Sequence, residues 1–350
     1  MQQNTVWGRA AQAGMVVTAA VLFGGCASIK SDSASAALQA DAMPVVQQAS
    51  SESMSVDDEL MFQLMAGELA GHFGQLKESV AYYMQAARLS RDPQVAARAT
   101  SIALYAEDEA SALEAAQRWV DLQPTGLEAR RTLAMLLVQR GDPEAAIDHF
   151  EYLLKHAPGP ADNGFMLIGA TLSQEKDAGT ALKSMRMLVN RHPDEAQAHY
   201  AYANLALGAK RHGQAVKAAN KALAIDPNLI EAGVVRARAL LMLGRTDQAV
   251  SSMQQTVQSA PDNYDLRTAY AKMLLQVERF EPARNEFSTL LKQRPKDADL
   301  LYTLGLLDLQ QEDYAGASSH FSRLIKTGQR IDESRYYLGR VAQERERSQE

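Results

Sequence analysis

Apolar positions along this chain recur with a helical period inside a longer repeat of about 34 residues. A proline falls near the same phase of most repeats, at spacings of 31, 34, 35, 34, 34 and 34 residues, in the series Pro93, Pro124, Pro158, Pro193, Pro227, Pro261 and Pro295. Because proline lacks an amide proton and clashes with the preceding turn, each one predicts the end of a helix. Such a repeat predicts a solenoid in which each unit buries its apolar face only against its neighbours.

Small residues recur at two fixed positions of the repeat when Leu127, Ile230 and their equivalents are counted as first. The eighth position is Ala134, Gly169, Ala203, Ala237, Ala271, Gly305 and Gly339, and the twentieth is Ala146, Ala181, Ala215, Ala249, Ala283 and Ala317. The twenty-fourth is often bulky, as at Phe150, Met185, Met253, Phe287 and Phe321. Small residues allow two helices to cross closely, and a bulky one fills the remaining gap. The pattern resembles the tetratricopeptide repeat and predicts an all-α, right-handed superhelical solenoid.

The solenoid is expected to occupy residues 56–350, with eight helix pairs and part of a ninth. Its units are expected to start near residues 60, 93, 127, 162, 196, 230, 264, 298 and 332. Residues 332–350 are typical of a first helix without its second. Two interpretations stay open, a solvating cap or a piece of a longer array, and Leu338 with Val341 favours the second because they suggest a face that awaits a partner.

Residues 1–26 predict a secretory signal that ends at a lipidated cysteine. Arg9 precedes an apolar run, Met15 to Phe23, which is too short to span a bilayer as a mature helix. The following Gly24-Gly25-Cys26 resembles the end of a bacterial lipobox, although Phe23 stands where leucine is usual. The resemblance implies acylation of Cys26, the only cysteine of the chain. An ordinary signal peptide with a chance cysteine, or a buried core thiol, is the alternative.

Several acyl chains would hold the protein firmly at a membrane. Ala27 follows the cysteine in place of the aspartate typical of inner-membrane retention, so we expect an anchor in the outer membrane with the solenoid on its periplasmic face. Residues 27–55 are rich in serine and alanine and predict a flexible tether. A tether of this length would reach about 30 Å.

Composition and motifs narrow the class of function. With 46% hydrophobic residues, 22% charged residues and a net charge of −6, the chain is typical of globular proteins, and no nucleic-acid partner is indicated. The sequence contains no glycine-rich phosphate loop, His-Glu-x-x-His motif or Gly-x-Ser-x-Gly elbow. His192, His199 and His212 fall on different expected elements, which argues against a shared metal. We therefore expect no catalytic residue, cofactor, metal or small-molecule substrate.

The expected binding surface is the inner face of the superhelix, where the fifth and ninth residues of each first helix lie together. Tyrosine, methionine and arginine there are types enriched at protein interfaces, and asparagine could hold a peptide backbone. The alternative is that the tyrosines pack and the cations are solvated. The lysine–asparagine arrangement that clamps a C-terminal carboxylate is missing, which disfavours that ligand. The candidate residues are Arg131, Met135, Tyr200, Asn204, Arg238, Lys272, Tyr302, Tyr336 and Arg340.

Three segments carry a narrower resemblance: residues 86–93, residues 97–106 and residues 127–134, with Trp119 between them. They are similar to the proteobacterial outer-membrane tetratricopeptide lipoproteins that act as adaptors for a periplasmic carboxy-terminal-processing protease. Residues 336–340 are similar to a later unit of that family. The resemblance implies that the chain binds and activates such a protease and brings it peptidoglycan hydrolases as substrates. Family members are longer than this chain.

Two other classes of function remain as alternatives. An assembly lipoprotein of the pilotin kind would escort an outer-membrane secretin or a pilus subunit and would have no link to proteolysis. An enzyme has little support, because a catalytic domain would have to lie beyond residue 350.

Overall fold

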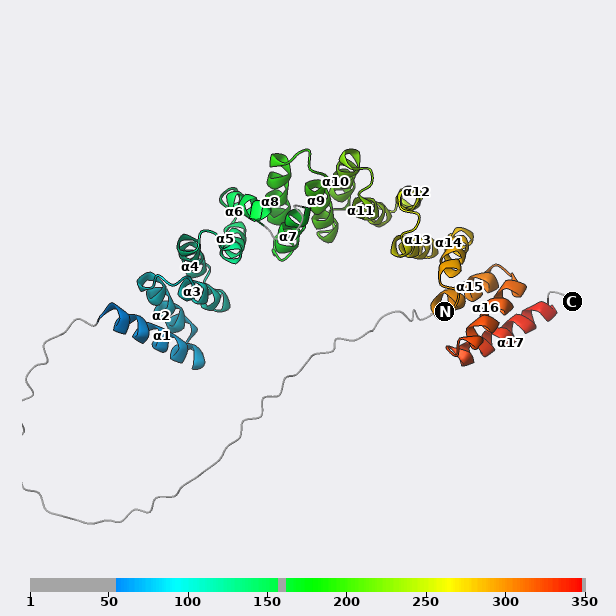
Figure 1. Cartoon of the computed structure of the whole chain (residues 1–350), viewed down its shortest axis with the longest axis horizontal. Helices are drawn as coiled ribbons and strands as arrows, with labels where there is room; N and C mark the ends of the chain where they lie inside the picture. Colours follow the sequence, from blue (N-terminus) through cyan, green and yellow to red (C-terminus); the bar gives the residue numbers. More distant parts are fainter. Residues whose placement is uncertain (1–54, 157–161, 348–350) are drawn as a thin grey trace, which may run out of the picture. The chain divides into compact units, whose positions relative to one another are not determined.

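The computed structural model describes residues 55–156 and 162–347, and only the backbone of residues 162 and 163. The described residues form seventeen helices and no strand (Figure 1). The predicted leader, Cys26 and most of the predicted tether lie outside them. The helices are α1 (Val56–His72), α2 (Leu76–Leu89), α3 (Pro93–Tyr105), α4 (Glu109–Leu122), α5 (Leu127–Gln139), α6 (Pro143–His156), α7 (Asp162–Leu172), α8 (Ala178–Arg191), α9 (Ala196–Gly208), α10 (His212–Ile225), α11 (Ile230–Met242), α12 (Thr246–Ser259), α13 (Tyr264–Gln276), α14 (Phe280–Gln293), α15 (Ala298–Gln310), α16 (Tyr314–Lys326) and α17 (Ile331–Arg347).

The helices follow one another as packed pairs, from α1 with α2 to α15 with α16, and α17 packs against α16 (Figure 1). Each second helix also packs against the first helix of the next pair. The predicted all-α solenoid of helix pairs is therefore confirmed. The first helix begins at Val56, ahead of the expected start near residue 60, because Ser55 caps it. The Ser55 hydroxyl accepts a hydrogen bond from the Asp58 amide at 3.2 Å and donates one to the Asp58 carboxylate at 2.6 Å.

Close crossing within each pair depends on the small residues of the eighth and twentieth positions. Ala134, Ala203, Ala237 and Ala271 are completely buried. At Gly305 an added Cβ would lie 2.7 Å from the ring of Phe321, the bulky residue at position twenty-four of the same unit. Glycine is therefore required at this crossing, since even a methyl group would displace the ring.

The turn between the two helices of a unit has a left-handed residue near its centre in seven units, at Gly74, Glu107, Gly141, Lys210, Gly244, Glu278 and Glu312. The next residue donates its amide hydrogen back five residues, as Arg245 does to the Leu240 carbonyl at 2.9 Å. This closure satisfies a carbonyl at the end of the first helix and reverses the chain.

The apolar core is divided among several clusters of buried residues. One large cluster runs from Val80 to Ala206 and includes Ala215 and Ala239, and a second runs from Ala237 to Val341. Two small clusters lie around Ala219 and Ala222 of α10. The two large clusters meet on α11, where Ala237 belongs to the second cluster and Ala239 to the first. Among the described helices, none is both long and apolar enough to cross a membrane.

A buried charge network joins α14, α15 and α16. Asp308 on α15 is completely buried and receives hydrogen bonds from the Arg284 guanidinium and from His320 Nδ1, the latter at 2.6 Å. Arg284 also donates to Asp313 at 2.8 Å. Burial by itself raises the pKa of Asp308, but the hydrogen bonds from His320 and Arg284 outweigh it and hold the pKa below its usual value. The carboxylate thus stays ionised inside the fold.

We expect Asp308→Asn to destabilise the C-terminal units by about 3 kcal/mol, because Arg284 loses its buried counter-charge and His320 loses its hydrogen-bond acceptor. The folded pKa of Asp308 is depressed, so its contribution is complete above the unfolded-state pKa of about 3.9 and is lost as the pH falls through the lower folded value. Urea unfolding of wild type and variant from pH 7 to pH 3 measures both effects, and the difference should shrink below about pH 4.

Asp299→Asn provides the control, because Asp299 pairs with Arg330 at an exposed position and should contribute less than about 1 kcal/mol. Equal stability of Asp308→Asn and wild type at pH 7 would contradict a stabilising role for the network.

Candidate partner-binding face

The unit of α7 and α8 departs from the turn geometry of the other units. Lys176 stands at the place of their left-handed residue, but its backbone stays outside the left-handed region. The amides of Gln174 and Glu175 donate three residues back, to the carbonyls of Thr171 and Leu172, both at 3.1 Å. As a result α7 ends at Leu172, two residues earlier in the repeat than α5 does at Gln139, while α8 begins in register at Ala178, so this pair is joined by a longer turn.

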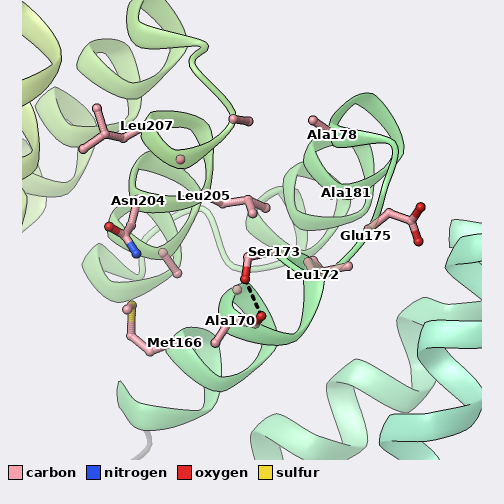
Figure 2. A pocket seen from close by; sticks show the side chains of 14 residues that line it. Met166, Ala170, Leu172, Ser173, Glu175, Ala178, Ala181, Asn204, Leu205 and Leu207 are labelled. Atoms are coloured by element: carbon pink, nitrogen blue, oxygen red, sulfur yellow. Dashed lines mark hydrogen bonds between the residues drawn. The ribbon is translucent and has the colours of Figure 1, made fainter. Parts of the chain in front are cut away.

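A hollow of about 610 Å³, which we call hollow 1, lies between α7, α8 and α9 (Figure 2). Alanine, glycine and leucine form most of its wall. Figure 2 shows Met166 and Asn204 on one side and Glu175 on the opposite side. The lining residues are Met166, Gly169, Ala170, Leu172, Ser173, Glu175, Ala178, Ala181, Ala201, Asn204, Leu205, Leu207, Gly208 and Ala209.

Small side chains keep hollow 1 open. Gly169 occupies the eighth position, and a Cβ added there would meet only the Ala201 carbonyl oxygen at 3.7 Å and the Ala201 Cβ at 3.8 Å, ordinary contacts. At the same position of another unit, Gly305 has no such room. The space at Gly169 therefore comes from the spread of α7 and α8, and not from the glycine alone.

Polar groups in hollow 1 differ in how well they are satisfied. The Ser173 hydroxyl donates to the Ala170 carbonyl at 2.6 Å, as the dashed line of Figure 2 marks. Glu175 Oε1 accepts from the Asp177 amide at 3.1 Å, whereas Glu175 Oε2 is buried without a hydrogen-bond partner. The exposed Asn204 amide can donate and accept at the rim. Hollow 1 thus combines an apolar wall with a few polar groups.

A second hollow of about 480 Å³, hollow 2, lies against α11, α12 and α13. Arg238 and Lys272, two of the predicted residues, both line it and are both exposed. Among the described residues, neither cation has a carboxylate within ion-pair distance, although Asp265 is part of the same lining. The rest of the wall is mostly apolar, formed by Val234, Leu241, Met253, Ala269 and Met273.

Tyr200 lies on α9 and is partly buried. Burial raises its pKa, nearby Glu231 adds to the shift and Arg238 opposes it. The phenol is therefore neutral at physiological pH and can donate a hydrogen bond. Tyr200 packs against the buried residues of α10 and α11 and lines neither hollow.

The remaining predicted residues line neither hollow. Tyr302 of α15 packs against α16 and α17. Its ring centroid lies 6.3 Å from that of Phe321 and 5.9 Å from that of Tyr337. The Arg330 guanidinium lies 4.7 Å above the ring. Burial and the neighbouring Tyr337 hydroxyl raise the pKa of Tyr302 to about 12. Met135 is partly buried against the core, while Arg131, Tyr336 and Arg340 are exposed. Binding by these residues stays a prediction.

Sequence reasoning missed the residues that make hollow 1 deep, above all Ser173, Glu175 and Gly208. The turn residue itself gave no signal, because Lys176 stands where Lys210 takes the left-handed conformation in another unit. A weaker signal was the run of polar residues from 173 to 177. In the ranges 55–156 and 162–347, no group of three or more His, Cys, Asp or Glu side chains is placed to hold a metal ion.

Comparison with known families identifies the repeats. Models described as tetratricopeptide repeat match residues 62–93, 99–166, 173–230, 206–273 and 240–304. Together with the paired helices, these matches place the chain in the tetratricopeptide-repeat family. Proteins of this fold are in general non-catalytic scaffolds that bind other proteins, and no catalytic family is among the matches.

One curated relative is the TPR repeat-containing protein PA4667 of Pseudomonas aeruginosa, which is 26% identical over 183 residues. The match covers 52% of this chain and 31% of the relative, so the chain spans about a third of that protein's length. Solved structures with a similar arrangement include a tetratricopeptide repeat protein from Parabacteroides merdae, with 15% identity, a TM-score of 0.36 and coverage of 71% of this chain and 98% of that one. Another is MamA from Desulfovibrio magneticus, with 17% identity, a TM-score of 0.35 and coverage of 49% and 97%.

The two glycines at position eight offer a matched test of hollow 1. We expect Gly169→Ala to leave stability unchanged or to raise it by up to about 1 kcal/mol, because alanine favours the helix and the methyl group has room. Gly305→Ala should instead destabilise by about 1–3 kcal/mol, because its methyl group would overlap the Phe321 ring. Thermal and urea unfolding of both variants measure the difference, and an equal loss of stability would show that hollow 1 is filled in solution.

Proposed function

We propose that this chain is a lipid-anchored, non-catalytic scaffold on the periplasmic face of the outer membrane. In this proposal it binds a carboxy-terminal-processing protease and presents peptidoglycan hydrolases to it. The observation that carries the proposal is hollow 2, where Arg238 and Lys272 lie beside a mostly apolar wall and, among the described residues, form no ion pair. Exposed cations beside an apolar floor suit an acidic, partly apolar protein segment.

Hollow 1 lies nearer the N-terminus of the chain and offers a second binding surface. Asn204 at the rim of hollow 1 can hydrogen-bond to a peptide backbone, while the apolar wall accepts a side chain. The choice of a protease and cell-wall hydrolases as partners is supported by the resemblance of residues 86–93, 97–106 and 127–134 to the adaptor lipoproteins. The outer-membrane location is supported by the sequence around Cys26.

A scaffold of this kind acts through effective concentration. If the protease and its substrate bind different units of one tethered array, the second encounter becomes intramolecular and no new chemistry is required. Any activation of the protease would follow from preferential binding of its active conformation.

The test is a capture experiment from detergent-solubilised envelopes with the full-length chain as bait, read by mass spectrometry. Wild type should capture a carboxy-terminal-processing protease together with cell-wall hydrolases. Arg238→Glu/Lys272→Glu should reduce capture about tenfold or more, because two cations facing an acidic segment become anions.

Lys217→Glu/Lys221→Glu is the matched control, since both lysines are exposed on α10, away from hollow 2, and the net charge changes equally. Capture of secretin or pilus components without a protease would replace the adaptor function with the assembly function. Equal loss in both double variants would show that net charge, and not hollow 2, governs binding.

A further inference from the structure

The first helix carries an apolar surface that the solenoid leaves uncovered. Met61, Phe62, Met65, Leu69 and Phe73 are 59%, 52%, 66%, 58% and 69% exposed. At 100° per residue, Met61, Met65 and Leu69 fall within about 80° of the α1 circumference, and Phe62 and Phe73 widen this to about 120°. We call these five residues the α1 stripe. The opposite face of α1 is used already, because Gly67 and Ala70 are buried on the side of α2.

The size of the α1 stripe is that of a binding surface. Five large side chains, each more than half exposed, present roughly 500 Å² of apolar area, the size of the largest patch on an ordinary monomer. Paired with an equal area, the stripe would bury about 1,000 Å² in total, the lower limit for a specific interface.

The charges along α1 select the occupant. Asp58 lies on the same side of the helix as the stripe at its N-terminal end, and His72 lies on that side at its C-terminal end. Met65 is seven residues, or two turns, from each of them, and four residues from both Met61 and Leu69. The row Asp58, Met61, Met65, Leu69 and His72 is therefore complementary to its own reverse, while Phe62 and Phe73 flank it beside Glu68 and Asp57 of the other copy. When two copies of α1 pack antiparallel about a twofold axis at Met65, Asp58 of each faces His72 of the other and Met61 faces Leu69.

We propose that the α1 stripe is a homodimer interface, formed by antiparallel packing of α1 from two copies of this chain. Twofold pairs of this kind are the commonest protein assemblies, and each contact occurs twice. The antiparallel order also brings the acidic first turn, with Asp57, Asp58 and Glu59, to the C-terminal end of the other helix, near His72 and Lys77.

Two other occupants fit less well. A membrane surface favours helices with lysine or arginine beside the apolar face, whereas α1 contains four acidic residues and neither of these cations. The preceding residues 27–54 hold few large apolar side chains, and only Met43, Val45 and Val46 lie together, fewer than the five residues of the stripe. A second copy supplies both the apolar area and, in its His72, a hydrogen-bonding partner for Asp58.

Cysteine cross-linking tests the position of the twofold axis. In the full-length chain, Cys26→Ser removes the only cysteine, and Met65→Cys then places one thiol per chain on the axis. We expect mild oxidation to give a disulfide-linked dimer, because only residues near the axis come within the roughly 4–7 Å between Cα atoms that a disulfide allows. Met242→Cys in the same background is the matched control, since Met242 is also 60% exposed but lies on α11.

A charge exchange tests the antiparallel order. His72→Asp would place two aspartates opposite each other at both ends and should weaken dimerisation about tenfold or more, measured by sedimentation equilibrium. Asp58→His/His72→Asp should restore the affinity, because the exchanged pair is again complementary. Circular dichroism checks that each variant is folded, since Asp58 also bonds to Ser55.

Three results would overturn the inference. The first is a wild-type chain that stays monomeric up to about 100 µM with no disulfide at Met65→Cys. The second is a charge exchange that fails to restore dimerisation when both variants are folded. The third is a monomer whose Met65→Cys thiol is protected from modification. Protection that appears only on adding phosphatidylcholine–phosphatidylglycerol vesicles would assign the stripe to lipid. Protection already present in dilute solution would assign it to the chain's own preceding segment.

Discussion

Every pair in this solenoid depends on how closely its two helices can cross. The alanines and glycines at positions eight and twenty set that distance, and the bulky residue at position twenty-four fills what remains. Because each unit buries its apolar face only against its neighbours, a change in one crossing alters the surface between units. Hollow 1 follows from this dependence, since a turn without the left-handed closure leaves α7 and α8 spread apart.

The all-α fold and the succession of helix pairs could be predicted from the sequence because they rest on periodicity. Proline and small residues at a spacing of 34 are local signals, and each is repeated in unit after unit. Chemistry specific to one unit was harder to predict. The partners of Asp308 lie 24 and 12 residues away, at Arg284 and His320, and nothing in the repeat pattern marks them as a pair.

The candidate binding face was predictable in part, because the helical period decides which residues share a face. Helical spacing brought Arg238 and Lys272 to the same face, and both line hollow 2. Tyr302 occupies an equivalent position, yet it packs against Phe321 and Tyr337, because the identity of a residue does not decide between packing and exposure. Hollow 1 depends on the backbone of the turn at residues 173–177, and a pattern of side chains does not record that conformation, since Lys176 stands where Lys210 is left-handed.

The packing of α7 has a consequence for mechanical behaviour. Among the described residues, α7 shares little surface with α6 and α8, whereas α11 packs closely against both α10 and α12. Cooperativity in a repeat array passes only through contacts between neighbours, so it is weakest where neighbouring helices touch least. A chain pulled from its two ends would therefore yield first near α7, and hollow 1 would be the first surface to change shape under tension.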